Sequence, residues 1–166
     1  MRTFDHFKPS TIRKLASERP TLRWATPKYL VDEILPLVDK RNIDVIEAGD
    51  SYAYPEFTIS PFALFHNVPN VGYHIWFENG QKAIYATDTN SLDGITAPGY
   101  DLYLIESNYA EKEILERIRQ KQDSGEHIYE WAVLNNHLSH EKAIDWLYAN
   151  MTQNSQYVLL HQHQER

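Results

Sequence analysis

The stretch "ALFHNVPNVGYHIWFENGQKAIYATDTN", from Ala63 to Asn90, decides the fold of this chain. Two apolar segments flank Asn79-Gly80, a dipeptide suited to the positive φ angles of a type I′ turn, so the stretch predicts a β-hairpin. Its apolar runs adjoin His66 and Asp88. Because a rigid sheet can aim side chains at its strand ends toward one point, these two residues are candidate ligands.

Composition limits the functions that the chain can have. The 166 residues fit a single domain covering positions 1–166. A formal charge of -7 argues against a broad nucleic-acid interface. The basic run around Arg13, Lys14, Arg19 and Arg23 could meet an anionic ligand, but a solvated helix face is the favoured interpretation of it. Without cysteine, a metal would need histidines and carboxylates. No apolar run approaches the roughly 20 residues of a membrane span, and the start resembles no signal peptide, so we expect a cytoplasmic protein.

Strand and helix patterns alternate along the rest of the chain, which predicts an α/β layered domain. The predicted helices cover residues 8–20, 26–38, 110–127 and 138–151. The predicted strands cover residues 43–50, 56–66, the hairpin, 100–108 and 156–163. The run at 100–108 is continuously apolar, as expected for a strand covered on both faces, and the run at 156–163 predicts a buried strand that ends at His161.

Capping residues and prolines refine these predictions. Pro9 and Ser10 are good first-turn residues for the first helix, and the helix that starts at residue 110 should end near Gly125. Thr26 and Ser139 are expected as N-caps, with Pro27 at the first helical position after Thr26. Pro61 indicates an edge or a bulge in its strand. In the helix at 110–127 we expect Leu115 to face inward together with Ile114 and Ile118.

Several ligand-type residues stand where predicted elements begin or end: Asp5, His6, His66, Asp88 and His161. Imidazole and carboxylate ligands suit zinc, manganese or iron. Each residue also has an ordinary structural interpretation, since a histidine after a strand is often a surface residue and Asp88 in "TDTN" fits an Asx turn. The combination of all five favours a metal site.

The motifs "FHNVPNVGYHI", "AIYATDTN", "LYLIESNY", "NNHLSHEKA" and "VLLHQH" resemble those of metallo-β-lactamase-fold hydrolases, in the branch with single-domain phosphodiesterases and nucleases. "MRTFDH" is similar to the end of the family's His-x-His-x-Asp-His signature, with Met1 and Thr3 at the places of its first two histidines. The resemblance implies a partial αβ/βα sandwich of mixed sheets flanked by helices. It also implies that the N-terminal strands are missing.

The resemblance further implies a site and its chemistry. The metal ligands would be Asp5, His6, His66, Asp88 and His161, holding one or two divalent ions, zinc or manganese. Asp5 and His137 would be the catalytic residues, His137 as a proton donor to the leaving group. An N-terminal helix residue without chemistry is an equally good interpretation of His137. Asn67 stands where relatives often carry an aspartate.

Three functional hypotheses remain at this level. The first is a metal-dependent hydrolase that cleaves a phosphodiester or another ester of a small molecule or a nucleic acid, impaired if the first metal site is lost. The second is a non-catalytic metal-binding or interaction module, and the third, a nucleic-acid binding protein without chemistry, is weakened by the acidic composition. A truncated sandwich would expose an apolar sheet face, which favours a homodimer or a complementing N-terminal segment as a partner. We expect no membrane partner.

Overall fold

The computed structural model describes residues 7–162 and divides the chain into two compact units, Met1–Asp50 and Ser51–Arg166. Within the described part of the chain, no helix is long and apolar enough to cross a membrane. The single domain over 1–166 stays a prediction.

The first unit contains two short parallel strands and the helical turns around them. Helix α1 (Pro9–Glu18) has Pro9 in its first turn, as predicted. Strand β1 (Trp24–Pro27) pairs with β2 (Ile43–Ile46), and the 3-10 helices η1 (Lys28–Leu30) and η2 (Lys40–Asn42) and helix α2 (Val31–Ile34) lie between them in sequence. The prediction of Thr26 as an N-cap and Pro27 at the first helical position is wrong. Both residues belong to β1, and Pro27 has an extended backbone, so the helical turns begin only at Lys28.

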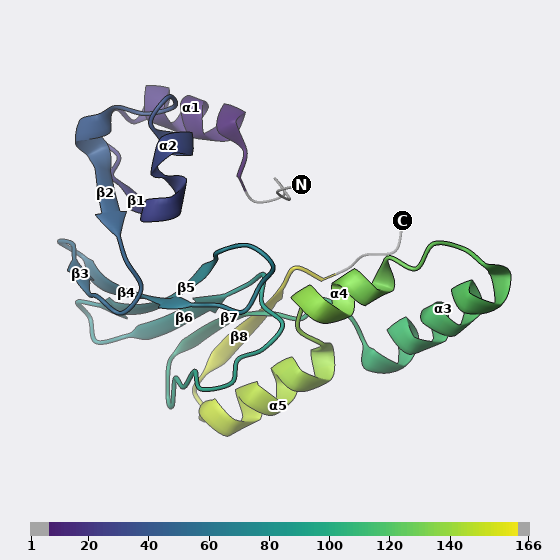
Figure 1. Ribbon diagram of the computed structural model, residues 1–166. Coiled ribbons are helices and arrows are strands. Elements are labelled where there is room, and N and C mark those ends of the chain that lie inside the picture. Colours follow the sequence, from purple (N-terminus) through teal and green to yellow (C-terminus); the bar gives the residue numbers. More distant parts are fainter. Residues whose placement is uncertain (1–6, 163–166) are drawn as a thin grey trace. The chain divides into compact units, whose positions relative to one another are not determined.

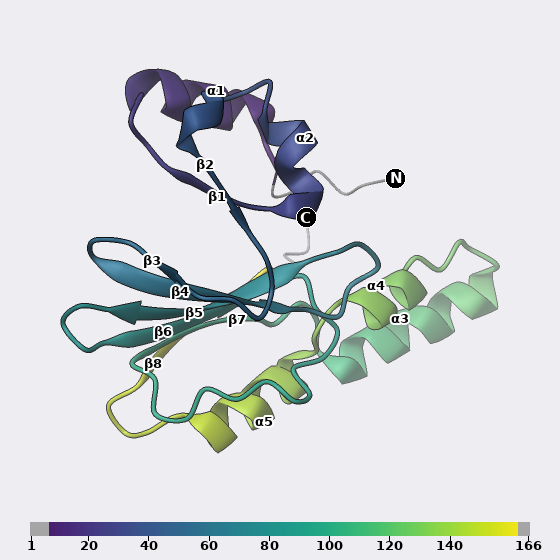
Figure 2. The ribbon, with the colours of Figure 1, turned by 60° about the vertical axis from the view of Figure 1, so that its left-hand side comes forward.

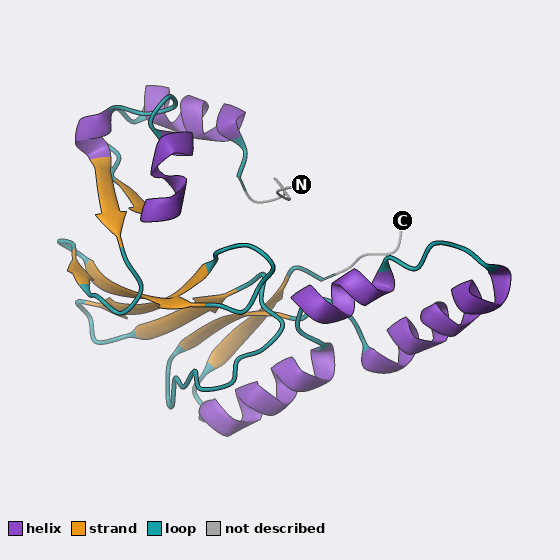
Figure 3. Ribbon diagram, viewed as in Figure 1, coloured by secondary structure: helices purple, strands orange, loops and turns teal. Residues whose placement is uncertain are grey.

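The second unit is built on a six-stranded sheet with the order β3-β4-β5-β6-β7-β8 (Figures 1 and 3). The strands are β3 (Tyr52–Ala53), β4 (Phe57–Ala63), β5 (Val71–Phe77), β6 (Lys82–Ala86), β7 (Leu102–Glu106) and β8 (Gln156–Leu160). Pairing is antiparallel from β3 to β6 and parallel from β6 to β8. The carboxyl ends of β6, β7 and β8 therefore lie at the same edge of the sheet.

The predicted hairpin forms between β5 and β6, but its turn is not type I′. That turn needs a positive φ at both central residues, whereas Gly80 has φ 85° and Asn79 has no positive φ. The Phe77 N–H donates to the carbonyl of Gln81 at 2.9 Å, so a longer loop closes the hairpin. Pro61 lies in β4 opposite Tyr73 of β5. Since β3 pairs only with Thr58 and Ile59, the missing N–H of Pro61 falls where β4 forms the sheet edge, as predicted.

Helix α5 (His140–Asn150) packs on one face of this sheet, as both views show (Figures 1 and 2). Ala143 and Leu147 of the helix share a buried cluster with Ile84, Tyr103 and Ile105 of the strands. The Ser139 side chain accepts a hydrogen bond from the Lys142 N–H, which confirms the predicted N-cap.

Helices α3 (Glu111–Ser124) and α4 (Glu130–Asn136) lie side by side beyond the sheet edge at which β6, β7 and β8 end (Figure 2). Gly125 ends α3 in the left-handed conformation, close to where the sequence placed the end. Leu115 is 46% exposed, so its predicted inward orientation is wrong, whereas Ile114 and Ile118 are buried.

The last strand is an edge strand, contrary to the prediction of a buried one. Its first three residues are exposed, and Tyr157 and Val158 are each about half exposed. An apolar run alone does not distinguish a central strand from an edge strand, because both bury at least one face. The strand nevertheless ends directly before His161, as expected.

Candidate metal centre

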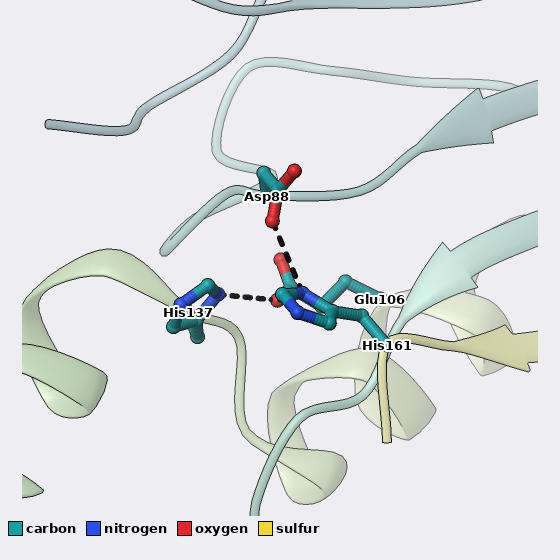
Figure 4. A group of neighbouring side chains, drawn as sticks. All are labelled: Asp88, Glu106, His137 and His161. Atoms are coloured by element: carbon teal, nitrogen blue, oxygen red, sulfur yellow. Dashed lines mark hydrogen bonds and ion pairs between the residues drawn. The ribbon is translucent and has the colours of Figure 1, made fainter. Parts of the chain in front are cut away.

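Three neighbouring parallel strands deliver polar side chains to one point (Figure 4). Glu106 is the last residue of β7, Asp88 follows β6 by two positions, and His161 comes directly after β8. His137, the residue after α4, completes the group. One ligand atom from each of these four residues lies within 4.8 Å of the others. We call Asp88, Glu106, His137 and His161 the strand-end cluster.

Glu106 is the centre of this cluster and is fully buried. Its Oε1 accepts hydrogen bonds from Nδ1 of His137 at 2.7 Å and from Nδ1 of His161 at 3.1 Å. Its Oε2 accepts a hydrogen bond from the backbone N–H of Thr89 at 2.6 Å. Burial raises the pKa of the Glu106 carboxyl, but these three hydrogen bonds outweigh burial and hold the pKa below its usual value. Glu106 is therefore an ionised carboxylate in the interior.

His161 lies between two carboxylates. Its Nδ1 is 3.1 Å from Oδ1 of Asp88 and 3.1 Å from Oε1 of Glu106. Hydrogen bonds to Asp88 and then to Glu106 raise the pKa of His161 to about 10, against a smaller opposing effect of burial. Without a metal, His161 is accordingly a protonated imidazolium at neutral pH.

Backbone conformation distinguishes two residues of the cluster. Asp88 has φ 55° and His161 has φ 53°, the only positive values among the non-glycine residues described. Side chains rarely adopt this left-handed region, and such residues cluster at functional sites because the surrounding structure must hold them there. The local backbone thus places both side chains at the cost of some strain.

His66 lies beside the cluster, three residues after the end of β4. Its ring centroid is 5.5 Å from that of His137. Burial is the main reason that the pKa of His66 is lowered, so the ring is neutral at neutral pH. Its Nδ1 is buried and has no hydrogen-bond partner among the residues described. A neutral imidazole with an unpartnered nitrogen is the form that binds a metal ion.

The donor set fits a divalent cation. Two carboxylates and two imidazoles within 4.8 Å of one another offer oxygen and nitrogen ligands of the kinds that zinc and manganese accept. Ligand atoms on opposite sides of an ion lie about 4 Å apart when each bond is about 2.1 Å, so small side-chain rotations would suffice. Glu106 already accepts hydrogen bonds from two imidazoles, so besides binding the ion it would serve equally well to orient these rings toward the ion.

The predicted residues divide into three groups. His137, Asp88 and His161 come together, and His66 lies next to them. Asp5 and His6 lie outside the described residues.

The sequence analysis missed Glu106, although this residue stands in the quoted motif "LYLIESNY". An acidic residue that ends an otherwise apolar strand is a usable signal, because its charge must find partners at the sheet edge. The ligand and catalytic roles of all these residues stay predictions.

Comparison with solved structures decides the fold. The metallo-beta-lactamase fold protein YhfI from Bacillus subtilis superposes with a TM-score of 0.70 over 100% of this chain, at 15% sequence identity. The chain has the metallo-β-lactamase fold. Human tRNase Z, short form (ELAC1), also has this fold in common with the chain, with a TM-score of 0.65 over 96% of it and 15% identity. This chain spans 64% of the YhfI chain and 69% of the tRNase Z chain.

Comparisons at the level of sequence give no match. No family model matches the chain, and a search of the curated proteins finds no relative. The predicted α/β class and the partial metallo-β-lactamase sandwich are confirmed by structure alone.

Proposed function

We propose that the chain is a metal-dependent hydrolase that cleaves a phosphodiester or another ester with a zinc or manganese ion. One observation carries the proposal: a buried carboxylate, Glu106, binds His137 at 2.7 Å beside the Asp88–His161 pair. The name tRNase of one structural neighbour agrees with a phosphodiester substrate. The ion, when bound, would lower the pKa of a water molecule and polarise the ester.

The side chains of the strand-end cluster would divide the work between binding and proton transfer. Asp88 and His161, with the neutral His66 beside them, would hold the ion. Glu106 fixes one nitrogen of His137, so a protonated His137 would have Nε2–H available for the departing oxygen. A positioned acid of this kind contributes about 10²–10⁴-fold to a rate.

The experiment measures metal content and hydrolysis on the same samples. Elemental analysis of the purified protein should find close to one zinc or manganese per chain, lost in Asp88→Ala and in His161→Ala. Bis(p-nitrophenyl) phosphate with added zinc or manganese should be hydrolysed by the unmodified protein and not by these variants. His127→Ala is the matched control, since His127 is exposed and lies outside the cluster.

The outcomes separate the functions. Metal and hydrolysis lost together support the hydrolase. Bound metal without hydrolysis of any phosphodiester or carboxylic ester would favour the non-catalytic metal-binding module. Hydrolysis that persists in both variants would contradict the proposed site.

A further inference from the structure

Asn70 lies outside the strand-end cluster and is the last residue of the loop that joins β4 to β5. Its Nδ2 donates hydrogen bonds to the carbonyl oxygens of Thr87 at 2.8 Å and of Asp88 at 2.9 Å. Its Oδ1 accepts a hydrogen bond from the backbone N–H of Val71 at 2.9 Å. The opposite orientation of the carboxamide would place its oxygen against two carbonyl oxygens, so the partners determine which end is the donor.

The two carbonyls that Asn70 binds belong to the peptide groups on either side of the Asp88 Cα atom. In an extended strand, successive carbonyls point to opposite sides of the chain, and one amide group could not reach both. Asp88 has φ 55°, in the left-handed region, where successive carbonyls point in similar directions. Asn70 therefore stabilises a backbone conformation that a non-glycine residue adopts only at a cost.

This conformation of Asp88 determines two contacts inside the strand-end cluster. Oδ1 of Asp88 lies 3.1 Å from Nδ1 of His161. The backbone N–H of the next residue, Thr89, donates to Oε2 of Glu106 at 2.6 Å. A rotation of the backbone at Asp88 would move the carboxylate away from His161 and this N–H away from Glu106. The hydrogen bonds of Asn70 thus act at the point on which both contacts depend.

Asn70 also connects the loop that carries His66 to the turn that carries Asp88, since His66 precedes it by four residues. A second link joins the same two segments, because Oγ1 of Thr89 accepts a hydrogen bond from the Phe65 N–H at 3.2 Å. The segments therefore stay joined when Asn70 is replaced. A substitution at Asn70 should disturb the turn at Asp88 without unfolding the site.

We propose that Asn70 is a positioning residue of the candidate metal centre, which holds Asp88 in the left-handed conformation that aims its carboxylate at His161 and at the ion. Asn70 does not bind the ion and acts through the backbone of Asp88. The inference rests on the metal-binding part of the proposed function. Loss of a residue that orients a metal ligand typically weakens metal binding by about 10–100-fold, which is the effect expected here.

Asn70→Asp removes the donor and keeps the shape of the side chain. One carboxylate oxygen can still accept the Val71 N–H, whereas the other faces two carbonyl oxygens and repels them. Zinc affinity, measured by competition with a chromophoric chelator, should fall by about 10–100-fold. Asn67→Asp is the matched control, because Asn67 is an exposed residue of the same loop and gains the same charge. A negative charge alone attracts a cation, so this control should not weaken zinc binding.

Backbone amide exchange of the metal-free protein measures the turn itself. The Thr89 N–H should exchange about 5–30-fold faster in Asn70→Asp, the factor for one or two lost hydrogen bonds. Amides in the middle of β7 should keep their exchange rates, whereas a general loss of stability would accelerate them as well. Asn70→Ala removes the donor without adding a charge and should have the same two effects, so the test does not depend on the folding of Asn70→Asp.

The outcomes separate the positioning role from the hydrolase. Weaker zinc binding together with faster exchange at Thr89 supports the positioning role, whether or not the protein hydrolyses an ester. Unchanged zinc affinity in both variants of Asn70, equal weakening in Asn67→Asp, or faster exchange throughout the sheet would overturn it. Bound zinc without hydrolysis contradicts the hydrolase alone, and hydrolysis with unchanged zinc affinity in both variants contradicts the positioning role alone. An unmodified protein that binds no zinc contradicts both.

Discussion

The pKa of His161 can be measured directly, and its value tests the arrangement of the candidate metal centre. Two carboxylates contact its Nδ1 at 3.1 Å each, and they raise its pKa from 6.5 to about 10. Asp88→Asn keeps the shape of the side chain and removes the charge that contributes most to this shift. Removing an opposite charge at this distance should lower the pKa of His161 by about 1–3 units.

The raised pKa of His161 has two consequences as the pH rises: the metal-free protein loses stability, and its affinity for a metal ion increases. Its contribution to the free energy of unfolding is fully present below the unfolded pKa of 6.5 and is lost as pH rises through about 10. A metal ion competes with the proton for the imidazole, so metal affinity should rise over the same window. While His161 is protonated, the increase should be up to about tenfold per pH unit.

Imidazole ¹⁵N chemical shifts of chelator-treated protein, followed from pH 5 to 11, measure the pKa of His161 directly. The unmodified protein should titrate near pH 10 and Asp88→Asn clearly lower. Asp93→Asn, an exposed acid in the same loop, is the control and should leave the titration of His161 unchanged. A pKa of His161 near 6.5 in the unmodified protein would refute the reasoning, as would an unchanged value in Asp88→Asn.

Three other predictions test the catalytic group and the frame of the site. His137→Ala should lower hydrolysis by about 10²–10⁴-fold without loss of bound metal, and equal loss of metal would show that His137 is a ligand. Tyr103→Phe should lower the free energy of unfolding by about 1–3 kcal/mol in urea titrations, because the hydroxyl binds two buried carbonyls and one N–H; Tyr148→Phe, 83% exposed, should change it little. Gly125→Ala should cost about 1 kcal/mol by the same measurement, since Gly125 has φ 72°.

The parts of the fold that depend on local sequence could be predicted. Helix α1 starts at its proline and α3 ends at its glycine because these residues restrict or free the backbone locally. Thr26 and Pro27 have equally good helix-start chemistry, yet they pair with β2 in a strand. The N-cap pattern is local, whereas that pairing joins residues about 20 positions apart, and the non-local contact prevails.

Residues of the candidate site could be predicted because they stand at strand ends, but their arrangement in space could not. Asp88 and His161 were visible because each follows an apolar strand. Their meeting requires β6, β7 and β8 to be parallel neighbours, an order that no single segment specifies. Glu106 shows the limit most clearly, since its importance comes from its place on β7 between the other two strands.

The strand-end cluster lowers the stability of the protein, and this is a reason to expect that the cluster serves a function. Apolar side chains in place of buried charged groups are often neutral or stabilising by about 1–4 kcal/mol, and Glu106 is fully buried. The left-handed backbones of Asp88 and His161 add about 1–3 kcal/mol each. A bound cation would offset these terms, so zinc at about 100 times its Kd should stabilise the protein by about 2.7 kcal/mol and raise its Tm. Asp88→Ala should abolish that rise, whereas an equal rise in the variant would mean that zinc stabilises the protein from another place.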